Sequence, residues 1–129
     1  MTKAATKIRR QPKYKAIRTE YGGRWYASKA EAARAAELDL LLRAGKIAWW
    51  LPQVPICLGL PENRYVVDFL VAESDGGGNS VTVHAEDVKG TETAKFRRDV
   101  KLWLAYAPFP LWIIKRGKVS EIIPGQETL

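Results

Sequence analysis

The stretch Arg64–Ala72 constrains the fold of this 129-residue chain more than any other. After its arginine it reads Tyr-Val-Val-Asp-Phe-Leu-Val-Ala, so that β-branched and aromatic residues lie on both faces of the strand it predicts. A strand that is apolar on both faces is typical of a sheet covered on both sides. Asp68 is the exception, because a buried carboxylate without a partner costs several kcal/mol. The stretch therefore predicts an α/β or α+β fold, a small mixed sheet flanked by helices, with a polar partner for Asp68.

The remaining segments supply the other elements of such a fold. The sequence Ser28-Lys29-Ala30-Glu31 has the form of a capping box, and Gly45 follows the Ala- and Leu-rich stretch that it opens. We expect a helix over 29–44, an edge strand near 53–58, a hairpin of strands 64–72 and 81–89, a helix over 92–106, and strands over 111–114 and 119–123.

The charge is concentrated near the N-terminus. The chain has 21 Lys and Arg against 14 Asp and Glu, a net charge of +7, and seven of these basic residues but only one acid lie in residues 1–20. Subtracting that segment leaves 14 basic and 13 acidic residues in 21–129, the predicted single domain. We expect residues 1–20 to be a mobile arm that lies on phosphates, the alternative being a solubilising tail. The side chains predicted to contact DNA are Arg9, Arg10, Lys13 and Lys15 in the arm, and Arg97, Arg98 and Lys101 on the second helix.

The composition excludes several classes of protein. One cysteine, Cys57, rules out an internal disulfide, and one histidine, His84, leaves a zinc site or a His-dependent hydrolase short of residues. No apolar run approaches the roughly 18 residues of a membrane span, and the charged N-terminus does not resemble a signal peptide. We therefore expect an intracellular protein that does not contact a membrane.

Three acids occupy positions where apolar residues would be expected. Asp68 interrupts its strand, Asp87 ends the next strand with Lys89 on the same face, and Glu31 shares a helical stripe with Ala35, Leu38 and Leu42. Each has a plainer explanation. Glu31 can be simply the acidic residue of the capping box. Asp68 can pair with a lysine such as Lys89, and Asp87 with Lys89 can form a solvated strand end.

Taken together, the three acids indicate a metal site. A hairpin brings the ends of its strands together, and the covering helix can bring Glu31 to the same rim. Clustered carboxylates suit Mg²⁺ or Mn²⁺, and a nearby ammonium can orient a water and offset phosphate charge. In a basic protein, this combination favours a phosphodiester hydrolase.

The arrangement resembles the D…(D/E)-x-K core of the PD-(D/E)XK nuclease superfamily, with Asp68, Asp87-Val88-Lys89 and a preceding helix that carries Glu31. The segments Ala27–Glu31, Gln53–Pro55 and Glu86–Gly90 are most similar to a phage-associated subgroup often compared with phage junction-resolving endonucleases. The resemblance covers about residues 14–115 and implies a restriction-endonuclease-like core.

The resemblance also implies roles for individual residues. Asp68, Asp87, the backbone carbonyl of Val88 and Glu31 would hold Mg²⁺ or Mn²⁺, and Lys89 would position the attacking water. Glu86 is the other acid at this position, but strand alternation sends it to the face opposite Lys89, which favours Asp87. His84 points with Glu86 and is expected to be structural, whereas Gln53 is expected to approach the site.

The sequence thus predicts a metal-dependent DNA endonuclease of phage type, acting in the cytoplasm of a bacterial host. Its small size favours structure-selective cleavage, as by a Holliday junction resolvase in DNA recombination, and symmetric junction cleavage would require a homodimer. One alternative is a non-catalytic nucleic-acid-binding module in which exposed Tyr14, Trp25 and Tyr26 stack on bases. Another is the DNA-cleaving subunit of a transposition or restriction system.

Overall fold

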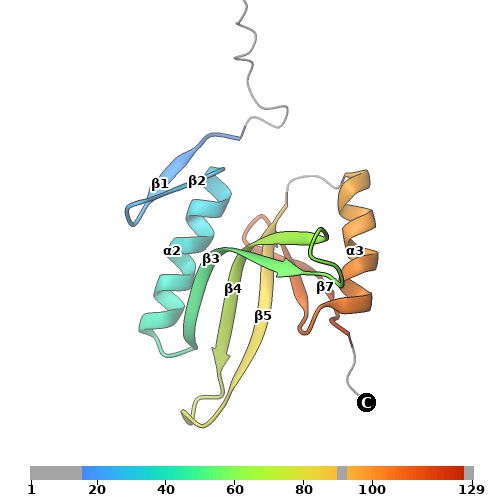
Figure 1. Ribbon diagram of the computed structural model, residues 1–129. Helices are drawn as coiled ribbons and strands as arrows, with labels where there is room; N and C mark the ends of the chain where they lie inside the picture. Colours follow the sequence, from blue (N-terminus) through green and yellow to red (C-terminus); the bar gives the residue numbers. More distant parts are fainter. Residues whose placement is uncertain (1–15, 90–92, 127–129) are drawn as a thin grey trace, which may run out of the picture.

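A computed structural model describes residues 16–89 and 93–126 of the chain, with helices and a sheet in an α+β arrangement (Figure 1). Its elements are β1 (Thr19–Tyr21), β2 (Arg24–Tyr26), α2 (Lys29–Arg43), β3 (Ile47–Cys57), β4 (Arg64–Ser74), β5 (Val81–Val88), α3 (Ala94–Tyr106), β6 (Leu111–Lys115) and β7 (Lys118–Ile123).

The main sheet has five strands in the order β3-β4-β5-β6-β7. All neighbours are antiparallel except β5 and β6, which are parallel and are connected through α3. A parallel pair requires such a crossover, since a short turn cannot return the chain to the start of the next strand. The sheet is therefore mixed, as predicted, and β4 and β5 form the expected hairpin.

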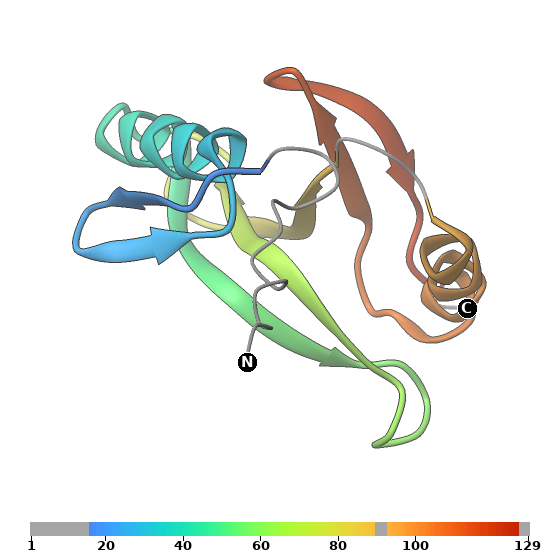
Figure 2. The ribbon, with the colours of Figure 1, turned by 90° about the horizontal axis from the view of Figure 1, so that it is seen from above.

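The two helices pack on different parts of this sheet. The helix α2 buries Ala32, Ala35 and Leu38 against Phe69 and Val71 of β4. The helix α3 belongs to a second core, formed by Phe96, Trp103, Ala107, Leu58, Tyr65, Val67, Ala85, Leu111, Ile113 and Ile123. Seen from above, α2 lies near the β3 end of the sheet and α3 near the β7 end, so each helix covers part of the sheet (Figure 2).

The predicted helices and most strands are confirmed, but the first strand of the main sheet is longer than predicted. It begins at Ile47 rather than near 53, although it contains Pro52 and Pro55. Because β3 is the edge of the sheet, a residue without an N–H group can lie there without leaving an acceptor unpaired in the ladder. The prolines were therefore no barrier to a strand of eleven residues.

Three further expectations from the sequence are wrong. The pair β1–β2 includes Thr19 and Glu20, which the charge pattern places in the arm, so regular structure begins earlier than residue 21. Tyr26 is not an exposed aromatic, because only 3% of it is accessible and it packs against the ring of Phe69. Leu42 faces solvent, since the buried stripe of α2 ends at Leu38.

The hairpin β1–β2 leaves Trp25 exposed, as expected, with the guanidinium of Arg18 lying 5.0 Å from the ring centroid. Within 16–89 and 93–126, neither helix has the length and apolar character needed to cross a membrane.

Candidate active site

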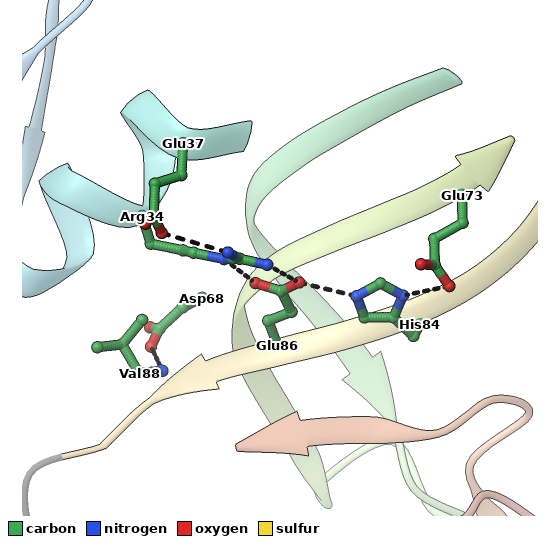
Figure 3. Close-up of polar contacts among 7 residues, drawn as sticks. All are labelled: Arg34, Glu37, Asp68, Glu73, His84, Glu86 and Val88. Atoms are coloured by element: carbon green, nitrogen blue, oxygen red, sulfur yellow. Dashed lines mark hydrogen bonds and ion pairs between the residues drawn. The ribbon is translucent and has the colours of Figure 1, made fainter. Parts of the chain in front are cut away.

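The candidate site lies where β4 and β5 separate. Their ladder runs from Ser74↔Val81 to Phe69↔Glu86, beyond which β4 stays paired with β3 and β5 with β6. Side chains bridge the opening. The backbone N–H of Asp68 donates to Asp87 Oδ1 at 2.9 Å. The N–H of Val88 donates to Asp68 Oδ2 at 2.9 Å, a contact drawn in Figure 3. The two aspartates therefore replace backbone pairing at this point and are held next to each other.

Asp87 is almost completely buried, with 3% of its surface accessible. Its Oδ2 atom accepts a hydrogen bond from the hydroxyl of Tyr65 and lies 3.4 Å from Lys89 Nζ. A solvated strand end is therefore excluded, and the ion pair of Lys89 is with Asp87 rather than with Asp68. The ammonium also lies 4.5 Å from the centroid of the Phe96 ring, which keeps it over the site.

Glu31 lies in the first turn of α2, and its backbone N–H donates a hydrogen bond to the hydroxyl oxygen of Ser28 at 3.1 Å. This half of the capping box is present. However, the buried side-chain atom Oε1 of Glu31 has no hydrogen-bond partner within the described residues. A capping role therefore leaves one carboxylate oxygen of Glu31 buried and unsatisfied, which is costly unless a cation or donor completes it.

The three acids repel one another. Burial, together with the charges of Asp87 and Glu31, raises the pKa of Asp68 to about 7. Burial also raises the pKa of Asp87, against the opposing effects of Lys89 and Tyr65. The pKa of Glu31 is raised by burial first and then by the charge of Asp87. The site thus concentrates negative charge that a cation would stabilise.

A cleft of about 350 Å³ opens onto Asp68 and Asp87, between β4 and the start of α3, and Glu31 does not line it. Besides the aspartates and Lys89 it is lined by Arg64 and Lys95, so that cations surround the carboxylates. Asp99 of α3 is also buried in its wall, and its Oδ2 accepts a hydrogen bond from Lys95 Nζ at 2.8 Å. A cleft with acids at its floor and cations at its rim is suited to a ligand that combines an anion with a metal ion.

The donor set fits a hard divalent cation, because Glu31, Asp68 and Asp87 all offer carboxylate oxygens. Glu31 and Asp68 each have a carboxylate oxygen that accepts no hydrogen bond from the described residues. Oε1 of Glu31 has no hydrogen-bond partner in the described part of the chain, and only one oxygen of Asp68, Oδ2, accepts a hydrogen bond from that part. Across 16–89 and 93–126, no three His, Cys, Asp or Glu side chains are already gathered closely enough to hold an ion. Binding would therefore draw the carboxylates together.

Glu86 belongs to a different set of contacts on the other side of β5. It is fully buried and receives hydrogen bonds from Arg34 Nε and Nη2, each at 2.7 Å (Figure 3). His84 Nε2 lies 2.8 Å from Glu86 Oε2, and its ring stacks on Trp112 with centroids 3.6 Å apart. Asp87 lines the cleft, whereas Glu86 and His84 do not.

The structure describes only three of the seven residues predicted to contact DNA. Arg9, Arg10, Lys13 and Lys15 lie outside the described residues, as does Tyr14. Arg98 lines a smaller cleft of about 140 Å³, which shares Arg64, Lys95 and Asp99 with the first. Arg97 and Lys101 are exposed on α3 but line neither cleft. Gln53 is exposed, with a positive φ of 53°, and does not line the cleft either.

Several residues of the site were missed by sequence reasoning. Tyr65 reads as one more aromatic residue of an apolar strand, and only its hydroxyl distinguishes its role. Arg64 and Lys95 belong to no recognisable sequence pattern. Asp99 differs, because an acid on the apolar face of a helix is an unusual feature that the sequence already shows.

Comparison of the chain with models of protein families, with curated proteins and with solved structures yields no match in any of the three.

Proposed function

We propose that the chain is a metal-dependent DNA endonuclease with the restriction-endonuclease-like site that its sequence resembles. The single observation that carries the proposal is the juxtaposition of Asp68 and Asp87 with Lys89 at the opening between β4 and β5. A buried carboxylate, that of Asp87, next to the half-buried carboxylate of Asp68 is a poor choice for stability alone, since repulsion between the two destabilises the folded state.

In the proposed reaction, Asp68, Asp87, Glu31 and the Val88 carbonyl would hold Mg²⁺ or Mn²⁺. When bound, such an ion supplies a Lewis acid for the phosphate and lowers the pKa of a coordinated water. Lys89 donates hydrogen bonds that orient the attacking water, and its charge offsets the charge that develops on the phosphate. Tyr65 and the backbone N–H of Asp68 keep the Asp87 carboxylate in one orientation.

Arg64 and Lys95 would hold the phosphates that flank the cleaved bond, because both lie on the wall of the cleft. Because the sequence resembles a subgroup compared with junction-resolving endonucleases, we propose cleavage selected by DNA structure, such as a branch. A non-catalytic nucleic-acid-binding module is the second candidate, favoured by the exposure of Trp25, 58% accessible beside Arg18.

The test is incubation of the full chain with four-way junction, flap, duplex and single-stranded DNA, each with Mg²⁺, Mn²⁺, Ca²⁺ or EDTA. The proposal predicts cleavage with Mg²⁺ and Mn²⁺, faster on branched DNA, and binding without turnover in Ca²⁺. Binding with no cleavage under any condition would favour the second candidate. Robust cleavage by metal-free protein in EDTA would reject the mechanism.

A further inference from the structure

The least expected feature outside the candidate site is the buried ion pair between α2 and β5. Glu86 has no accessible surface, the Arg34 side chain is 14% exposed, and the two meet through paired hydrogen bonds of 2.7 Å (Figure 3). His84 Nε2 lies 2.8 Å from one oxygen of the same carboxylate, and Glu37 lies 3.2 Å from Arg34 Nη1. Both ends of the pair are thus held in one geometry by further partners.

Stability alone is a weak reason for such a pair. Removing two charges from water costs several kcal/mol each, and apolar residues of similar volume are often as stabilising in the same place. What a paired, planar contact supplies is a fixed geometry between the elements that it joins.

The positions of the two partners along the chain show which geometry is fixed. Arg34 follows Glu31 by three residues, so both lie on one side of α2, about 4.5 Å apart along the helix axis. Glu86 immediately precedes Asp87 on β5, and their side chains leave opposite faces of the strand. The ion pair therefore joins α2 to β5 within one helical turn of Glu31 and one residue of Asp87.

We propose that Arg34 and Glu86 are positioning residues that set the place of Glu31 relative to Asp68 and Asp87, and so complete the site for a divalent cation. This inference rests on the proposed function, because it takes the three acids to be ligands. Arg34 and Glu86 touch neither substrate nor metal in this account. They act through Glu31, whose Oε1 atom is buried and unsatisfied within the described residues.

The test measures Mn²⁺ binding by calorimetry and the melting temperature in EDTA for the wild type and three variants. The first variant is Arg34→Met/Glu86→Gln, which removes both charges together and leaves an amide oxygen to accept from His84. The second is Glu31→Gln, and the third combines all three changes. Arg43→Met, an exposed arginine in the last turn of α2, is the matched control.

We expect the charge-neutral pair to melt near the wild-type temperature while its Mn²⁺ affinity falls about 10- to 100-fold, as for other residues that orient metal ligands. Glu31→Gln should lose a similar factor, and the triple variant should lose no more than the larger of the two, because both changes act through one carboxylate. Arg43→Met should bind as the wild type does. Additive losses, or unchanged affinity in the folded double variant, would overturn the positioning role.

If the double variant fails to fold, Arg34→Lys takes its place, since it keeps the charge but cannot make the paired contact. A folded Arg34→Lys protein with full Mn²⁺ affinity would likewise overturn the inference. A wild type that binds no Mn²⁺ would instead reject the metal site of the proposed function, and the positioning role with it. The Mn²⁺ affinity of the wild type thus distinguishes a failure of the proposed metal site from a failure of the positioning role alone.

Discussion

The crowding of acids around Asp68 predicts an unusual dependence of stability on pH in the metal-free protein. An ordinary aspartate ionises with a pKa of 3.8, whereas that of Asp68 is raised to about 7 by burial, Asp87 and Glu31. Between these values the folded state holds a proton that the unfolded state has lost. The free energy of unfolding should therefore fall as the pH rises from about 4 to about 7.

The size of the effect follows from the difference between the two pKa values. About three pH units at about 1.4 kcal/mol each give a loss of at most about 4 kcal/mol across this range. Asp68→Asn cannot ionise, and its side-chain oxygen can still accept the N–H of Val88. The variant should therefore be the more stable protein at pH 7 and should lose much less stability over the same range.

The assay is urea unfolding of both proteins in EDTA at several pH values from 4.5 to 7.5. Asp75→Asn is a suitable control, because Asp75 is exposed in the β4–β5 turn and amide donors lower its pKa. It is ionised in both states throughout this range, so its variant should keep the wild-type slope. Parallel curves for wild type and Asp68→Asn would refute the reasoning, since Asp68 would then ionise as in the unfolded chain.

Three other predictions concern the basic residues. Lys89→Ala should lower turnover by about 10²- to 10⁴-fold, with DNA affinity reduced only slightly, and a fully active variant would remove Lys89 from the mechanism. Arg98→Ala should weaken both cleavage and DNA binding, measured by anisotropy, whereas Arg97→Ala should do neither to the same degree, because Arg98 but not Arg97 lines one of the two clefts described above. Equal effects of the two changes would count against this path for the DNA. Deleting residues 1–12 should lower the slope of log K against log[salt] by at most about 3 to 4 without abolishing cleavage, and an unchanged slope would show that the arm makes no phosphate contact.

Much of the fold could be predicted because its signals are local. The helix over 29–44 is marked by its cap and its composition, and the strand Arg64–Ser74 by residues that favour a pleated, buried surface. The strands β1 and β2 were missed because three residues each are too few to show a period of two. The start of β3 was missed because two prolines suggested a loop, although an edge strand accommodates them.

Some residues of the candidate site could likewise be predicted from local sequence, whereas other contacts depend on the tertiary arrangement. Asp68 and Asp87 could be placed side by side from the hairpin alone, since an acid in an apolar strand demands a partner. The contact between Arg34 and Glu86 spans 52 residues and depends on how α2 lies on the sheet, which no local pattern records. The hydroxyl of Tyr65 is a further case, because its contact with Asp87 depends on how β4 and β5 separate.

We propose that Asp68 and Asp87 form a site for metal-dependent hydrolysis of DNA. The most direct measurement is the rate of cleavage of an end-labelled four-way junction in Mg²⁺ by the wild type and by Asp68→Asn, purified in parallel and both shown to be folded. This proposal predicts cleavage by the wild type and a loss of at least about 10³-fold in the variant, which still binds the junction. Equal rates for the two proteins, or no cleavage of any DNA by the folded wild type in Mg²⁺ or Mn²⁺, would contradict it.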